Sequence, residues 1–428
     1  MRIFFNWSVL AIFTACLATP SLAGVFYDDG ATTMHFAFEG SPNGDRPIVR
    51  PPAFYHADDG FGFVDSPLLT GNRLGVSAPK YFRFDVNLPD GNYDVAVTLG
   101  NPDYDSITTV KAEGHRPMLL DVRVGAGENV TKTFTVNVRH GADPHYDVDG
   151  NLDPNDHSVS LDLDGCLNLE FVGVNPSMTK LDIQPNPTAI SVYLAGDDKV
   201  CDSDHIRFTG WGQMLPIFFK PGEIAVSNQA SFSGITTIEE ARLKSIDSTI
   251  KHGDYLLIEF DDGAIYARPG VADRYKNFLR TYIGTARKHG ATPVLVTPVP
   301  QRTFFTGTKL FNDEADPGWV RELAAEEKVS LIDLTASATA FINQLGPDES
   351  KKAFAYYPAS TFPNQPEAMA DNGHFSAYGA LEMAKLVAQA IKDQKLDLTA
   401  HLTGNLATNP DPAKFPAHLG YDFLLNNK

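Results

Sequence analysis

The sequence predicts two folded parts, a β-sandwich over residues 25–186 and an α/β domain with a parallel sheet over residues 189–428. In the first part, short runs of alternating apolar and polar residues are separated by Gly, Pro and Asp turns, without a clear helix. In the second part, apolar strands alternate with helical segments, which is typical of a parallel sheet covered on both faces. A length of 428 residues also favours more than one domain.

The strands of the first part are predicted from period-two alternation. Segments 81–88 and 93–99 flank a turn at 89–92, where Pro, Asp and Gly follow one another. Further strands are expected at 119–124, 132–138, 158–163 and 167–172. Pro185-Asn186-Pro187 then marks the hinge to the second part.

The second part is predicted to contain strands at 190–195, 224–228, 255–260, 293–297 and 330–334. Its clearest helix spans 271–289 and ends at Gly290. A second helix is expected at 376–393, with Ser376 as its N-cap. In such folds the active crevice lies beyond the carboxyl ends of the strands, where Asp198 and Asp261-Asp262 fall.

Residues 1–23 are predicted to be a secretory signal peptide. Arg2 precedes an apolar stretch, and Ser21-x-Ala23 offers small residues for cleavage. We therefore expect a secreted or periplasmic protein, and no other segment is apolar enough to span a bilayer. Two cysteines remain after cleavage, Cys166 and Cys201, and they could form one disulfide or remain separate buried thiols.

The formal net charge of −18 argues against nucleic acid and anionic membranes as partners. The composition, 43% hydrophobic and 21% charged, is that of a globular protein. The sequence does not specify an oligomeric state.

An acid and a histidine lie close together just before the last predicted helix. In Asp371-Asn372-Gly373-His374, a tight polar turn would let His374 overhang the strand ends while Asp371 fixes its tautomer. A histidine at a helix start is more often a cap or a core contact, so this pair needs support from other segments.

Several blocks occur in the order found in one enzyme family. They are Tyr193-Leu194-Ala195-Gly196-Asp197, Gly210-Trp211-Gly212-Gln213, residues 253–260, residues 293–304 and Asp371-x-x-His374-Phe375-Ser376. Over residues 189–395 the chain resembles the SGNH (GDSL-type) hydrolases, and most of all the rhamnogalacturonan acetylesterases. The resemblance implies a three-layer α/β/α domain with a flavodoxin-like parallel sheet. Residues 109–113 and 137–139 resemble the galactose-binding-like sandwich that precedes some bacterial members.

The resemblance also implies roles for individual positions, and three of the four functional blocks are altered. His374 and Asp371 match the catalytic histidine and its orienting acid, but the position of the nucleophilic serine holds Asp198. The oxyanion asparagine is replaced by Gly263, and the oxyanion glycine aligns with Ser233, or with Gly234 if the register slips by one. Serine-esterase turnover is therefore not expected.

Three interpretations of Asp198 remain open. The first is a pseudoenzyme, a degenerate esterase retained as a glycan-binding or scaffolding protein. In the second, hydrolysis continues with Asp198 as a covalent nucleophile or with His374 activating water. The third is a Ca²⁺ or Mg²⁺ site built from Asp197, Asp198, Asp261 and Asp262, although such acids more often face solvent or cap helices. The family itself requires no cofactor.

The expected partner is a polysaccharide or oligosaccharide, of the pectic kind that the resemblance implies. Trp211, Phe232 and Tyr266 could line a sugar groove, although aromatic residues near strand ends more often belong to the core. Arg302 matches a basic family position and is the expected polar contact to substrate. The acidic run at 147–156 fails the EF-hand pattern because its glycine is misplaced, so a solvated turn is expected there.

Overall fold

The structure is a computed structural model. It describes residues 33–38, 53–64, 68–72, 75–141, 164–203, 207–231, 237–261, 270–304, 315–362 and 365–416, with the single residues 49, 66, 307, 309, 310 and 419. The predicted signal peptide, the strand expected at 158–163 and the acidic run at 147–156 lie outside these residues.

The first part of the chain forms antiparallel sheets, as its alternating pattern predicts. A four-stranded sheet has the order β1 (Met34–Ala37), β12 (Lys180–Pro185), β6 (Gly91–Leu99), β9 (Val130–Val138). A five-stranded sheet has the order β2 (Phe61–Val64), β5 (Tyr81–Asn87), β10 (Cys166–Val174), β7 (Ser106–Ala112), β8 (Arg116–Val124). A small sheet of β11 (Ser177–Met178), β4 (Gly75–Ser77) and β3 (Thr70–Asn72) adjoins them. The turn at 89–92 carries the chain from the five-stranded to the four-stranded sheet.

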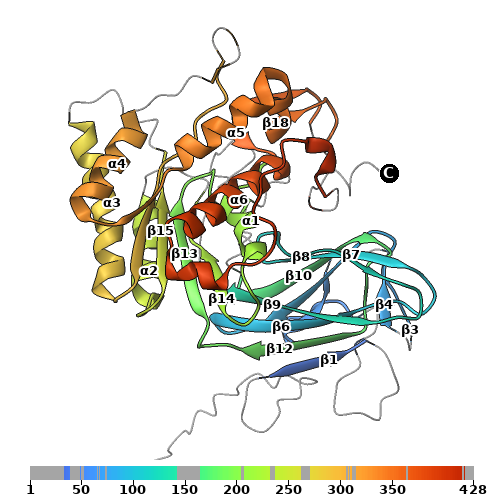
Figure 1. Cartoon of the computed structure of the whole chain (residues 1–428). Coiled ribbons are helices and arrows are strands. Elements are labelled where there is room, and N and C mark those ends of the chain that lie inside the picture. Colours follow the sequence, from blue (N-terminus) through green and yellow to red (C-terminus); the bar gives the residue numbers. More distant parts are fainter. Residues whose placement is uncertain are drawn as a thin grey trace, which may run out of the picture.

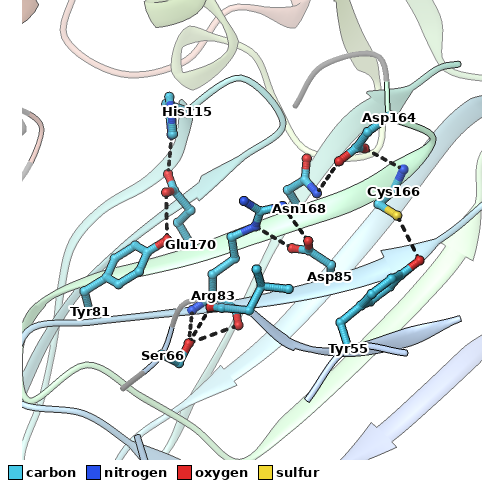
Figure 2. Close-up of polar contacts among 11 residues, drawn as sticks. Tyr55, Ser66, Tyr81, Arg83, Asp85, His115, Asp164, Cys166, Asn168 and Glu170 are labelled. Carbon is cyan, nitrogen blue, oxygen red and sulfur yellow. Dashed lines mark hydrogen bonds and ion pairs between the residues drawn. The ribbon is translucent and has the colours of Figure 1, made fainter. Parts of the chain in front are cut away.

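Strict alternation in β5 separates the apolar core from a polar sheet face. Phe82 and Phe84 are fully buried and belong to the core between the sheets, where Phe82 stacks on Phe171. The intervening side chains form polar pairs on the other face (Figure 2): Arg83 donates two hydrogen bonds to the Asp85 carboxylate. Arg83 and Asp85 can be buried at tolerable cost because each is hydrogen-bonded to the opposite charge, while the Tyr81 hydroxyl donates to the Glu170 carboxylate.

The second part contains a five-stranded parallel sheet, in agreement with prediction. The order is β14 (Ile224–Asn228), β13 (Ile190–Gly196), β15 (Tyr255–Glu259), β16 (Thr292–Val296), β17 (Ser330–Ile332). In chain order this is 2-1-3-4-5, the flavodoxin-like arrangement. The chain order reverses around β13, and in such folds the functional site lies beyond the carboxyl ends of the strands at this reversal.

Helices cover both faces of this sheet (Figure 1). One face packs on α2 (Thr237–Thr249), α3 (Val271–Lys288) and α4 (Ala315–Glu327). The other face packs on α1 (Trp211–Met214), α5 (Leu334–Glu349) and α6 (Ala377–Asp393). The remaining elements are the short 3₁₀ turns Leu215–Phe218, Ser350–Ala353, Asp397–His401 and Pro412–Lys414, and a hairpin of β18 (Phe354–Tyr357) and β19 (Met369–Phe375).

The two helices predicted in detail are confirmed. Helix α3 buries Tyr275, Leu279, Tyr282 and Ile283, and Gly290 follows its end with a φ of 72°. Helix α6 begins after Ser376, whose hydroxyl accepts a hydrogen bond from the Gly379 N–H at 3.3 Å. The turn predicted at 371–374 falls within β19, at an irregularity of the hairpin between the pairs Tyr356–Ala370 and Phe354–Phe375. Asp371 Oδ1 accepts the backbone N–H groups of Gly373 and His374, which is a local turn contact.

Both cysteines that follow the predicted signal peptide are free, so the disulfide alternative is wrong. The Tyr55 hydroxyl lies 3.5 Å from Cys166 Sγ, and Cys201 Sγ contacts the Asp198 carbonyl oxygen at 3.6 Å. Of the helices in the described ranges, none combines the length and apolarity that crossing a bilayer requires.

We expect Gly379→Ala to destabilise the fold by several kcal/mol. A Cβ at Gly379 would lie 1.9 Å from the Ala353 carbonyl oxygen, so the start of α6 would have to move away from that backbone. Gly284→Ala in α3 is the matched control, since its Cβ would meet nothing within 4 Å and should stabilise the helix by up to about 1 kcal/mol. Urea unfolding measures both, and equal effects would contradict this packing.

Candidate functional site

The candidate site lies at the carboxyl ends of β13 and β15, where the sheet order reverses. Asp197 and Asp198 follow β13, and Asp261 follows β15. Gly196 lets these strand ends approach, because a Cβ there would lie 2.6 Å from the Glu259 carbonyl oxygen. The strand register thus brings acids separated by more than 60 residues to one place.

Three of the predicted catalytic residues meet in a continuous hydrogen-bonded row. His374 Nε2 lies 2.9 Å from Asp198 Oδ2, and His374 Nδ1 lies 2.7 Å from Asp371 Oδ2. The second oxygen of Asp371 accepts the backbone N–H groups of Gly373 and His374, at 2.7 and 3.0 Å. Phe208 packs on the imidazole with a ring-centroid distance of 4.4 Å. Both nitrogens of His374 are therefore occupied by carboxylates.

This row keeps His374 positively charged. Burial would lower the pKa of His374, but the hydrogen bonds to Asp198 and Asp371 outweigh it and raise the pKa to about 9. Burial would raise the pKa of Asp198, but the hydrogen bond to His374 and the charge of Lys199 lower it to about 2. At neutral pH the row is carboxylate, imidazolium, carboxylate.

A second set of charges lies directly beneath Asp198. Lys199 Nζ is 2.5 Å from Asp261 Oδ2, and the Asp197 carboxylate accepts the backbone N–H of Asp261 at 2.5 Å. Burial, and then the neighbouring Asp198 charge, raise the pKa of Asp197 well above its usual range. The carboxylates around Lys199 raise its pKa although burial opposes this. Each charge at the base of the site therefore has an internal partner.

Glu259 and Trp211 form a further buried contact under the site. Glu259 is 1% exposed and accepts hydrogen bonds from Trp211 Nε1 at 2.6 Å and from the Val299 N–H at 3.2 Å. Burial raises the pKa of Glu259 to about 7 despite these bonds. Trp211 is itself 1% exposed, so we assign it to the support of the site and not to a sugar-binding surface.

Arg302 supports the segment that carries the histidine. Its side chain donates to Asn372 Oδ1 and Ser350 Oγ, each at 2.9 Å, and its own backbone N–H donates to the Asn372 carbonyl. The Tyr356 hydroxyl also donates to Asn372 Oδ1, at 2.6 Å. With its guanidinium bound to protein groups and 7% exposed, Arg302 is placed to hold the Asp371–His374 segment and not to contact substrate.

Within the described ranges, no group of three or more His, Cys, Asp or Glu side chains could hold a metal ion. Lys199 occupies the position beside Asp261 that a cation would take, which is the physical reason why Asp197, Asp198 and Asp261 do not form the predicted site. The remaining predicted residues, Asp262, Gly234, Gly263, Phe232 and Tyr266, lie outside the described residues.

The sequence analysis did not single out three residues of the site, which are Lys199, Glu259 and Phe208. Lys199 and Asp261 follow neighbouring strands with opposite charges, and this complementarity could have predicted their ion pair. Glu259 stands out as the one acid in an apolar strand, which signals a buried partner. Phe208 carries no such signal, because only the fold brings it to the imidazole.

Comparison with known proteins shows to which family the chain belongs. No protein-family model matches it. The rhamnogalacturonan acetylesterase RhgT of Bacillus subtilis (strain 168) is 38% identical over 221 residues, which are 50% of this chain and 94% of RhgT. The chain belongs to the rhamnogalacturonan acetylesterase family of SGNH hydrolases. The probable rhamnogalacturonan acetylesterase YesY of the same organism is 37% identical over 49% of this chain and 95% of YesY.

A further relative matches a larger part of the chain. The uncharacterized esterase YxiM of Bacillus subtilis is 28% identical over 73% of this chain and 74% of YxiM. A crystal structure of the YxiM protein covers 85% of this chain and 99% of its own, with 25% identity and a TM-score of 0.44. Esterases of the SGNH type need no cofactor.

We predict that the charged row stabilises the fold in a defined pH window. Because the pKa of His374 rises from 6.5 to about 9, its contribution is complete below pH 6.5 and is lost as pH rises through 9. The pKa of Asp198 falls from 3.8 to about 2, so its contribution to the unfolding free energy is complete above about pH 4 and is lost as pH falls through 2.

The wild-type protein should therefore be more stable than His374→Gln by a larger unfolding free energy at pH 6 than at pH 10. The difference between the two pH values should be about 3 kcal/mol at most. Urea titrations of both proteins at the two pH values measure this difference. A difference that stays constant with pH would contradict the assignment of charge to His374.

Proposed function

We propose that this chain is an exported carbohydrate-binding protein of the acetylesterase family whose site does not hydrolyse esters by the serine mechanism. The supporting observation is the 2.9 Å contact between His374 Nε2 and Asp198, the residue at the nucleophile position. A serine esterase needs this nitrogen free to accept the proton of the nucleophile. In this chain the raised pKa of His374 keeps Nε2 protonated near neutral pH, and the Asp198 carboxylate accepts its hydrogen bond.

General-base catalysis is disfavoured by the same contact. A base must be unprotonated at the working pH, whereas the pKa of His374 is raised to about 9. Asp198 is a poor replacement, because a carboxylate whose pKa is lowered to about 2 attracts a proton from water only weakly. Neither group is suited to activate a water molecule near neutral pH.

Covalent catalysis by Asp198 is also disfavoured. Attack of its carboxylate oxygen on an acetyl ester would give a tetrahedral adduct carrying two groups that could leave. The carboxylate is a far weaker base than a sugar alkoxide, so the adduct would expel Asp198 and return to the starting ester. The predicted loss of the oxyanion asparagine at Gly263 would add to this barrier, as would Ser233 if it holds the oxyanion-glycine position in place of Gly234.

The ligand class follows from the family. RhgT and YesY are described as acetylesterases of rhamnogalacturonan, and their similarity to this chain supports a pectic or acetylated polysaccharide as its ligand. Export is proposed from the apolar stretch and small-residue cleavage pattern of residues 1–23. The proposal also includes the division into a sandwich domain that ends at residue 186 and an α/β domain that begins at residue 189.

A second candidate function is acetyl-ester hydrolysis. It is favoured by family membership and by the 2.7 Å contact between Asp371 and His374, which matches the orienting contact of a working triad. The two functions differ in whether wild-type protein turns over an acetyl ester.

We expect wild-type protein to show no turnover of p-nitrophenyl acetate or acetylated rhamnogalacturonan, and Asp198→Ser to gain esterase activity. Serine would remove one carboxylate from His374 and restore a nucleophile beside an oriented base. The gain should fall about two to three orders of magnitude short of an intact family site, because an oxyanion donor is predicted to be missing.

The control is Asp198→Ser combined with His374→Ala, which should be inactive. Wild-type turnover that His374→Ala abolishes would overturn the proposal in favour of the second candidate. Calorimetric titration with rhamnogalacturonan oligosaccharides tests the binding function, and absence of binding to both acetylated and deacetylated forms would remove it.

A further inference from the structure

Arg116, the first residue of β8, extends from the sandwich into the α/β domain. Its Nε donates to Asp202 Oδ2 at 2.7 Å, and its Nη1 donates to the Val226 carbonyl at 3.3 Å. Both side chains of the Arg116–Asp202 pair are 1% exposed. Asp202 lies on the loop after β13, four residues beyond Asp198, so the sandwich holds the loop that carries the candidate nucleophile position.

Arg139, which follows β9, makes the corresponding contact with the loop after β14. Its Nη1 donates to Gln229 Oε1 at 2.8 Å, and its Nη2 donates to the Asn228 carbonyl oxygen. From the other side, Arg242 of α2 donates to the Ala230 carbonyl oxygen. Strands β9 and β14 lie side by side at this point (Figure 1). One arginine from each domain therefore fixes this loop.

Asn228 joins the two loops to each other. Its Nδ2 donates to the Val200 carbonyl and to Asp202 Oδ1, each at 2.9 Å. The loop after β14 also donates backbone hydrogen bonds to the carbonyls of Leu194 and Gly196, at 2.8 and 3.0 Å. The sandwich arginines and both loops consequently form one buried network.

We infer that Arg116 and Arg139 are positioning residues, through which the sandwich holds the Asp198 loop and the loop after β14 in register with His374. Arg116 is buried and bound at two points, the Asp202 carboxylate and the Val226 carbonyl, which together define its distance and orientation. RhgT is matched over 94% of its length by 50% of this chain, so half of this chain has no counterpart in that match. Here the sandwich supplies part of the support of the site.

The experiment compares Arg116→Met with Arg83→Met. Arg83 is a matched control because it also binds a buried aspartate, Asp85, through two nitrogens, but entirely within the sandwich (Figure 2). NMR titration of the His374 imidazole is the measurement, with the resonance assigned from its loss in His374→Gln. We expect Arg116→Met to lower the His374 midpoint by about one pH unit or more, and Arg83→Met to leave it unchanged.

The direction of the change separates positioning from simple electrostatics. Removal of a positive charge stabilises a nearby imidazolium and would raise the His374 midpoint. Displacement of Asp198 from His374 removes a hydrogen bond and a negative charge, and lowers it. A midpoint that rises or stays constant in folded Arg116→Met would overturn the inference.

Folding is controlled with a double variant. Arg116→Met leaves Asp202 buried without its cation, whereas Arg116→Met with Asp202→Leu replaces the pair by apolar groups and removes the link to Asn228. The double variant should show the same fall in the His374 midpoint, and an unchanged midpoint would overturn the inference even if the single variant does not fold. Since the titration requires no turnover or glycan, its outcome is independent of the proposed function.

Discussion

Charge buried at the end of a parallel sheet must be neutralised inside the protein, and the whole site follows from that constraint. The reversal of strand order at β13 gathers acids from several loops at one edge of the sheet, where Asp197 is buried and Asp198 and Asp371 are partly buried. Lys199 neutralises Asp261, and His374 is shared by Asp198 and Asp371. Asp198, Asp261 and Asp371 are therefore each bound to a basic side chain of the protein itself.

Prediction from sequence succeeded where local pattern and fold coincide. The apolar strand at 224–228 and the helix ended by Gly290 carry their own periodicity and stop signals, so they were found almost to the residue. The meeting of Asp198 with Asp371 and His374 was predictable because the segment before the last helix can overhang the strand ends of such a sheet, and because the family resemblance pairs these positions.

Prediction failed where the partner of a residue is distant in sequence. The Asp371–His374 segment lies between the pairs Tyr356–Ala370 and Phe354–Phe375 of the β18–β19 hairpin, and nothing in its own residues specifies β18 as its neighbour. Arg302 and Trp211 were expected at a ligand surface because type and position suggested it. Their burial is decided by Asn372, Ser350 and Glu259, which only the packed fold brings within hydrogen-bonding reach.

The Asp198 carboxylate binds His374 as an external ligand could, but it is covalently part of the chain. It presents to His374 the same chemical group as free acetate, the product released by an acetylesterase such as the related RhgT. Because it is tethered, its effective concentration at the imidazole is set by a short loop and not by the solution. A carboxylate from solution could bind His374 Nε2 only by displacing the tethered Asp198 carboxylate. Under the proposed function Asp198 stands at the nucleophile position and offers no hydroxyl, so reagents that label the nucleophilic serine of serine hydrolases would not react there.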